Sequence, residues 1–176
     1  LQQAGFHEAG IFTINEKFSR NRKFVDLTIT ADAGPLYRAG TIEVLIDGQP
    51  TNNFSKVVEL RENRAFDLVK HKRTLRALET YFRNRGYRDC KVEFDAKDNS
   101  DNVIDLQYKV SRGDSFQIGS VLVVGNRTTK KGLIERKLNL SRGAIYDASR
   151  ILRARRRIQA LGYFASVRIE EIVDPI

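Results

Sequence analysis

The sequence predicts an α+β fold of tandem β-α-α-β-β modules, each a three-stranded mixed sheet covered on one face by two helices. Three observations predict it: an internal repeat of about 80 residues, apolar residues that alternate as in strands, and apolar residues that recur at helical spacing. The chain has 176 residues, of which 41% are hydrophobic and 30% charged. This composition is typical of a folded chain and too apolar for a disordered one.

The repeat is carried by short signatures. A Gly, an aromatic residue three positions later and a second Gly three beyond it occur at residues 34–40 and again at 113–119. Phe66-Asp67 is matched by Tyr146-Asp147, and Gly86-Tyr87 is matched by Gly162-Tyr163 and by Gly5-Phe6. The repeat therefore predicts three parts: the C-terminal part of a module (1–34), a complete module (35–112) and a module that lacks its last strand (113–176).

The first part is expected to begin with the last turn of a helix at residues 1–5. Phe12 and Ile14 then indicate one strand, and the alternation over residues 25–31 indicates a second, with a polar turn near residues 20–22 between them.

In the complete module, the alternation of Ile42, Val44 and Ile46 predicts the first strand. A short first helix is expected around Phe54, Val57 and Val58, with Thr51 or Asn52 as its N-cap. The second helix is marked by apolar residues at helical spacing and by a terminal glycine: His71, Leu75, Leu78, Phe82 and Gly86. Residues 92–96 and 104–110 then alternate on either side of a polar turn and predict a hairpin.

The last module is expected to repeat this order. Val121 and Val123 indicate its first strand, residues 133–138 its first helix and residues 148–161 its second. Val167 and Ile169 indicate its second strand. Right-handed connections and short hairpin pairing favour the strand order first, third, second in each module, so the second strand forms an edge.

The charge of the chain favours acidic partners. Lys and Arg number 31 against 22 Asp and Glu, which gives a formal net charge of +9. The longest aliphatic run, at residues 121–124, is far shorter than a membrane-spanning helix requires. The chain contains no Met and no signal-like start, so we expect it to be an excerpt from a longer precursor.

Catalysis and metal binding are not expected from this sequence. His7 and His71 have no neighbouring His or Cys at ligand spacing, so no metal site and no cofactor are predicted. The single Cys90 cannot form an internal disulfide, and without a catalytic partner we interpret it as a small, partly buried thiol. A binding protein, not an enzyme, is therefore expected.

The sequence resembles a run of POTRA domains, the polypeptide-transport-associated modules. The resemblance is most specific at residues 118–128, 143–147 and 161–167, and it departs from the family pattern at residues 47–49 and 62–64. It implies the BamA/TamA-like family of outer-membrane assembly and translocation proteins. It also implies a periplasmic scaffold, part of an outer-membrane protein of the Gram-negative envelope, whose partners are unfolded outer-membrane proteins and accessory subunits.

The alternative is a basic nucleic-acid-binding repeat protein of the KH type, which also has a β-α-α-β core. KH domains clamp the nucleic-acid backbone with a GxxG loop between two helices. The corresponding segments here, residues 60–64 and 140–144, contain no GxxG. We therefore expect no nucleic acid among the partners.

Three sets of candidate binding residues follow from these patterns. The edge strands are expected to accept an extended client segment, or else to be edges merely blunted by charge; they are Lys91, Val92, Glu93, Phe94, Val167, Arg168, Ile169 and Glu170. A basic helix face is expected either to be only solvated or to attract an anionic membrane surface or an acidic accessory protein; it comprises Arg150, Arg153, Arg156 and Arg157. The inter-module joints are expected at Gly34, Pro35, Tyr37, Gly113 and Phe116.

Overall fold

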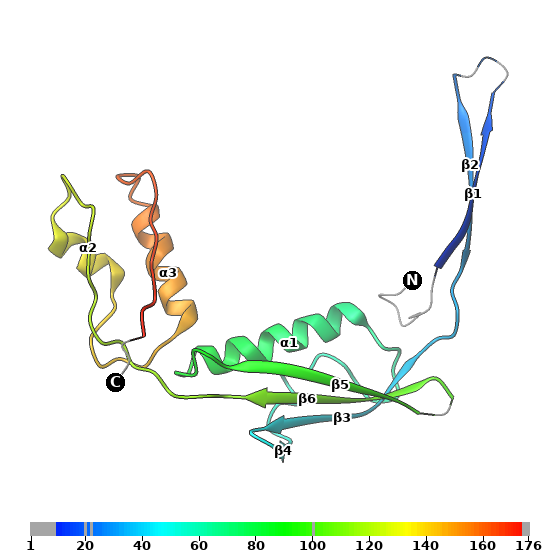
Figure 1. Ribbon diagram of the computed structural model, residues 1–176, viewed down its shortest axis with the longest axis horizontal. Helices are drawn as coiled ribbons and strands as arrows, with labels where there is room; N and C mark the ends of the chain where they lie inside the picture. The colour runs from blue at the N-terminus through cyan, green and yellow to red at the C-terminus, as the bar shows by residue number, and fades with distance from the viewer. Residues whose placement is uncertain (1–9, 20, 22, 100, 174–176) are drawn as a thin grey trace. The chain divides into compact units, whose positions relative to one another are not determined.

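The computed structural model describes residues 10–19, 21, 23–99 and 101–173 and has the predicted α+β class (Figure 1). The predicted helical turn at residues 1–5 and His7 lie outside the described residues. In chain order the elements are β1 (Gly10–Phe18), β2 (Val25–Asp32), β3 (Arg38–Ile46), β4 (Gln49–Thr51), α1 (Leu68–Arg83), β5 (Lys91–Asn99), β6 (Val103–Ser111), α2 (Lys131–Leu138) and α3 (Ala148–Gln159). They belong to two compact units, Leu1–Ala77 with Val92–Val110 and Leu78–Lys91 with Ser111–Ile176.

Strands β1 and β2 form the antiparallel pair expected in the first part of the chain. The turn is closed by the Ser19 N–H, which donates to the Phe24 carbonyl at 2.9 Å. The Asn21 side chain accepts hydrogen bonds from the Ser19 hydroxyl and the Lys23 N–H, the local polar bonding that favours Asn in turns.

The sheet of the complete module has the order β4-β3-β6-β5. β3 and β6 pair in parallel, and β6 is central, so the predicted order of first, third and second strand is confirmed. Ile104, Leu106, Tyr108 and Val110 of β6 are all buried and alternate with half-buried residues. β4, a three-residue strand antiparallel to β3, was not predicted.

The predicted first helix of the complete module is wrong. Residues 52–58 form a single turn, in which the N–H groups of Val57 and Val58 both donate to the Phe54 carbonyl. Thr51, one of the two expected N-caps, is the last residue of β4, so only a short segment remains before Leu60. One turn is enough to bury Phe54 and Val58, because residues four apart lie on the same helical face.

Helix α1 confirms the second predicted helix. Its N-terminus is capped by the Asp67 carboxylate, which accepts hydrogen bonds from the N–H groups of Val69 and Lys70. Thr74 is fully buried on its inner face, and its hydroxyl accepts a hydrogen bond from the Glu59 N–H at 3.0 Å. Because its hydroxyl is hydrogen-bonded, Thr74 can occupy a core position, whereas the neighbouring Leu75 is only half-buried.

The two modules repeat the same local backbone geometry. The Phe66 N–H donates to the Tyr37 carbonyl at 2.9 Å, and the Tyr146 N–H donates to the Phe116 carbonyl at 3.0 Å. Asn63, where the complete module departs from the family pattern, has φ 60°, and Gly143 has φ 78° at the matching position. Asn tolerates this left-handed conformation, so the departure in sequence leaves the loop unchanged.

In the last module the two predicted helices are confirmed as α2 and α3, but the two predicted strands are wrong. Residues 119–124 and 164–171 are not strands, although Val121, Val123, Val167 and Ile169 pack against the buried cluster of this module. That cluster consists of Ile134, Leu138, Ala154 and Ile158. In the complete module β6 separates β3 from β5 and hydrogen-bonds to both, and no described residue after α3 supplies such a strand. The alternation therefore directs side-chain packing without a ladder partner.

His71 lies in the aromatic core beneath the edge strand β5. Its ring centroid is 4.1 Å from that of Phe94, and its Nδ1 lies 3.2 Å from the Tyr108 hydroxyl. Burial, with a smaller contribution from the charge of Lys72, lowers the pKa of His71 below its ordinary value of 6.5. The sequence predicted His71 on the apolar face of the helix, and in the structure it lies in α1 and is buried.

The lowered pKa of His71 predicts a loss of stability in mild acid. Below pH 6.5 the unfolded chain takes up a proton at this position that the folded chain does not, so stability is fully present above pH 6.5 and falls as pH decreases toward the folded pKa. The slope stays below about 1.4 kcal/mol per pH unit, the limit for one proton. Urea unfolding between pH 7.5 and about 5 measures it, above the range where carboxylates titrate.

The matched control is His71→Phe, which keeps a ring against Phe94 and removes the titrating group. We expect its stability to vary less with pH over the same window. An equal slope in both proteins would show that another group causes the pH dependence.

Candidate functional site: the β5 edge, the basic helix face and the joint

The β5 edge is formed by a nine-residue strand at the end of the sheet. Within the described residues, β5 is last in the strand order, after β6, so the N–H and C=O groups on its other side have no strand partner. Val92 and Phe94 are half-buried on the core side, while Lys91, Glu93 and Asp95 are exposed. The prediction that this strand is an edge is confirmed.

The solvent face beside this edge carries opposite charges on neighbouring strands. Lys109 of β6 forms an ion pair with Asp95 of β5, and Gln107 of β6 donates to Glu43 of β3 at 3.1 Å. Such pairs hold the strands in register. The charges of Lys91 and Glu93 also blunt the edge against indiscriminate pairing with other chains.

The second predicted edge, residues 167–170, is not a strand. Arg168 and Glu170 form an exposed ion pair at 3.7 Å, and Val167 and Ile169 point into the module's apolar cluster. These residues have the expected in-and-out alternation, but no ordered ladder edge is formed.

The four arginines of the basic helix face lie close together on α3. Arg150, Arg153, Arg156 and Arg157 line one open groove with Asn139, which caps the C-terminus of α2. The guanidinium of Arg150 donates two hydrogen bonds to the Asn139 carbonyl, at 2.7 and 3.1 Å. Arg153 lies 3.8 Å from Asp147.

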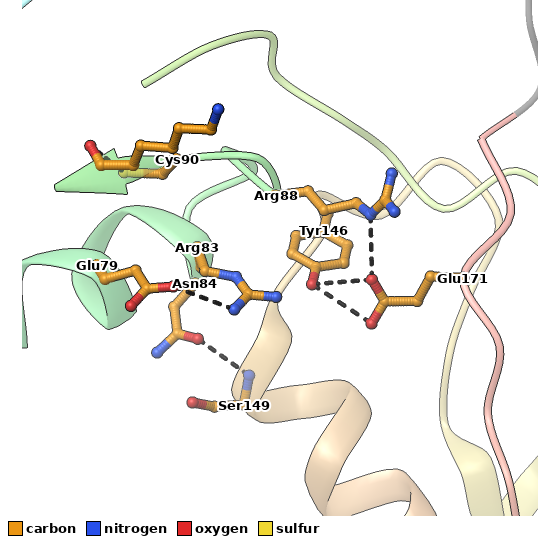
Figure 2. Close-up of polar contacts among 9 residues, drawn as sticks. Glu79, Arg83, Asn84, Arg88, Cys90, Tyr146, Ser149 and Glu171 are labelled. Carbon is orange, nitrogen blue, oxygen red and sulfur yellow. Dashed lines mark hydrogen bonds and ion pairs between the residues drawn. The ribbon is translucent and has the colours of Figure 1, made fainter. Parts of the chain in front are cut away.

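The joint is a set of polar contacts within the second unit, between residues 83–88 and the last module (Figure 2). The Asn84 side chain accepts a hydrogen bond from the Ser149 N–H at 3.0 Å, at the start of α3. Arg88 Nε donates to Glu171 at 3.2 Å, and the Tyr146 hydroxyl donates to the same carboxylate. Figure 2 shows Tyr146 and Arg88 both directed at Glu171.

Arg83 and Tyr146 complete the joint. The Tyr146 ring is buried, and this burial raises the pKa of its hydroxyl. Arg83 hydrogen-bonds to Tyr146 and lies 3.4 Å from Glu79 on its own helix. Its Nε is buried and has no hydrogen-bond partner among the described residues. An unpaired buried donor costs free energy, so the other contacts of Arg83 must hold the side chain in this position.

Gly86 sets the backbone of the joint. It has φ +106°, and its carbonyl accepts a hydrogen bond from the Phe116 N–H at 2.9 Å. A Cβ at this position would lie 2.7 Å from the Ser115 hydroxyl oxygen and 3.3 Å from Ile145 Cγ2. Only glycine allows both this conformation and this close approach.

The other predicted joint residues occupy loops. Phe116 is half-buried, with the Arg88 guanidinium 5.9 Å from its ring centre. Gly34 and Gly113 both have positive φ, and the Gly34 N–H donates to Asp32. Pro35 and Tyr37 are half-buried, and the Tyr37 carbonyl accepts from Phe66 as described above. A contact of Tyr37 between modules stays a prediction.

Sequence reasoning missed the polar residues of the joint: Arg83, Asn84, Arg88, Tyr146, Ser149 and Glu171. The matched Phe66-Asp67 and Tyr146-Asp147 pairs were the available signal. In the structure both Asp residues cap helices, and the Tyr146 hydroxyl is the feature that Phe66 lacks.

These features define a class: small α+β repeat modules in tandem, with an open sheet edge and a basic helix face. The family model for POTRA, described as "Surface antigen variable number repeat", matches residues 43–113 and 116–175. The chain therefore belongs to the POTRA family.

Relatives and solved structures agree with this. The outer membrane protein assembly factor BamA of Neorickettsia risticii is 26% identical over 172 residues, which is 97% of this chain and 23% of the relative. BamA of Neisseria meningitidis serogroup B is 19% identical over 174 residues, 97% of this chain and 22% of the relative. The crystal structure of Haemophilus influenzae BamA POTRA3-5 has a TM-score of 0.64 at 19% identity and covers 99% of this chain and 69% of that one.

The chain spans less than a quarter of the length of these two relatives. The family match and the relatives place the modules in the periplasmic part of an outer-membrane protein, which confirms the expected location. None of the helices in the described part of the chain combines the length and hydropathy needed to span a bilayer.

The joint predicts that Gly86→Ala destabilises the second unit by about 1 to 3 kcal/mol. The new Cβ would meet Ser115, and the left-handed backbone would be strained. Urea unfolding measures the loss of stability, and amide hydrogen exchange should show faster exchange at the Phe116 N–H, which donates to Gly86.

Gly132→Ala is the matched control. Gly132 lies in α2 with nothing within 4 Å of its added Cβ, so Ala should leave stability unchanged or raise it by up to about 1 kcal/mol. Equal stability of the Gly86→Ala protein and the wild type would contradict the role of Gly86.

Proposed function

We propose that these modules act as a periplasmic scaffold that binds unfolded outer-membrane proteins by strand addition at the β5 edge and also docks accessory subunits. The observation that carries the proposal is the unpartnered side of β5 in the order β4-β3-β6-β5. The names of the relatives, outer membrane protein assembly factors, support a client that is itself an outer-membrane protein.

The form of the edge suits clients that share β-structure but no fixed sequence. An incoming strand would be held by main-chain hydrogen bonds, each contributing about 0.5 to 1.5 kcal/mol. Residues 96–99 of β5 are all exposed, so this half of the strand adds few side-chain contacts of its own. Weak and permissive binding follows, and it allows the client to leave.

The core beneath β5 keeps this edge rigid enough to act as a template. Phe94 packs on His71 and on Tyr108, whose ring centroid lies 5.5 Å from that of Phe94. Tyr108 is fully buried in the central strand. An incoming strand therefore meets a preformed ladder and does not have to pay for ordering β5.

The proposal also includes the module boundaries, which we place between residues 34 and 35 and between residues 112 and 113. Each module would offer one surface to a partner, the complete module its β5 edge and the last module its helix face. Accessory subunits would dock on surfaces other than the client edge, so that both can be held together.

Proline substitution on β5 tests the proposal. Successive N–H groups of an edge strand alternate between the neighbouring strand and solvent, so only one of Val92→Pro and Glu93→Pro removes an outward N–H. We expect that variant to keep the circular dichroism and unfolding midpoint of the wild type yet crosslink several-fold less to an unfolded outer-membrane protein.

The other proline variant is the internal control, because it removes a bond to β6 and should lower the unfolding midpoint. Thr41→Pro in β3 cannot serve as a second control, because proline would remove the hydrogen bond that the Thr41 N–H donates to Asp105. Undiminished crosslinking by the folded proline variant would place client binding away from this edge.

A further inference from the structure

The four arginines of the basic helix face lie on one flank of α3. Residues 150, 153 and 157 follow the helical spacing of three and four, and Arg156 continues the stripe outward. Ala154 and Ile158 occupy the buried face, so the arginines cannot turn inward. Together with Asn139 they line an open groove of about 550 Å³.

The complete module provides an internal comparison for this groove. Equivalent positions are fixed by the shared geometry: Phe54 and Ile134, Val58 and Leu138, and Thr74 and Ala154 are buried alike. On this basis Asn139 corresponds to Glu59, Arg153 to Arg73 and Arg157 to Ala77.

Charge is balanced in one module and not in the other. In the complete module Arg73 lies 3.7 Å from Glu59, and Lys70 lies 3.8 Å from the capping Asp67. In the last module Asn139 replaces the carboxylate and Arg157 adds a cation, and among the described residues Asp147 forms an ion pair with Arg153 alone of the four arginines. A groove that has lost its internal counter-charge and gained a cation is suited to an external anion.

We propose that this groove binds the phosphate of an anionic phospholipid headgroup. The phosphodiester of a headgroup has two charged oxygens in a tetrahedral arrangement, so guanidiniums that approach from different sides can each contact it, in single or bidentate geometry. Leu152, one turn before Arg156 on the helix, is exposed and can reach the apolar boundary of a bilayer. A periplasmic module of an outer-membrane protein works beside such a surface. The inference does not depend on client binding at β5.

The test is cosedimentation of the 176-residue chain with vesicles at about 0.15 M salt, where distant charges are screened. Vesicles of phosphatidylcholine with phosphatidylglycerol should bind the chain, and vesicles that carry the same charge as oleate, which has no phosphate, should bind it at least about five-fold more weakly. Equal binding to both would overturn the proposal in favour of bulk charge attraction.

Two variants probe the groove itself. Replacement of Arg156 and Arg157 by Gln should weaken binding to phosphatidylglycerol vesicles about ten-fold or more, because each basic residue near such a surface contributes several-fold in affinity. Asn139→Asp restores a carboxylate at the position of Glu59, in a residue type that tolerates its φ of 53°, and should weaken binding about five-fold.

The matched control replaces Arg73 and Arg76 of α1 by Gln, which makes the same change in net charge on the corresponding helix face. It should change binding by less than about two-fold. An equal loss in the control would overturn the assignment to α3. Competition by millimolar inorganic phosphate, sufficient to release the chain from vesicles, would overturn the lipid as the source and leave a free phosphate group as the ligand.

Discussion

The pairing of β6 with both β3 and β5 is the constraint on which the complete module depends. β6 supplies the most regularly buried strand, with Leu106 and Tyr108 almost or fully inaccessible, and α1 covers these residues through Thr74 and His71. Gly40 marks how tightly β3 approaches it: the Asp105 carboxylate of β6 accepts from the Thr41 N–H and fills the space where a Cβ would stand. A central strand fixed in this way leaves β5 as the outermost strand.

The last module shows what side chains achieve without that pairing. Its helices form and bury Ala154 and Ile158, and Val121 and Val167 still pack inward. Residues 119–124 and 164–171 nevertheless form no strand. Alternation determines which side chains are buried, but a strand also needs a neighbouring strand for its N–H and C=O groups. Among the described residues, packing and pairing occur together in the complete module, whereas residues 119–124 and 164–171 show packing alone.

This separation explains how much of the structure could be predicted. The spacing of apolar residues such as Leu78, Phe82 and Ile158 is enough to predict their helices. Gly86 predicts the end of a helix because glycine adopts the left-handed conformation found there. The prediction of a first helix in the complete module was wrong because a single turn also gives the spacing of Phe54 and Val58. The polar contacts of the joint were missed for another reason. Arg88 and Glu171 are 83 positions apart, and no local sequence pattern pairs two common charged residues at such a separation.

The two modules share the positions that maintain the repeat and differ at others. Positions that maintain the repeat, such as Asp67 and Asp147 at the helix caps, perform the same task in both. Two positions that differ change a polar contact: the buried Phe66 becomes the buried Tyr146, whose hydroxyl reaches Glu171, and the exposed Glu59 becomes Asn139, which leaves the arginine groove without that carboxylate. Because Tyr146 keeps a buried aromatic ring where the complete module has Phe66, and Asn139 is exposed, both changes alter a polar contact without removing a buried side chain. The joint and the groove are therefore additions to a scaffold that both modules share.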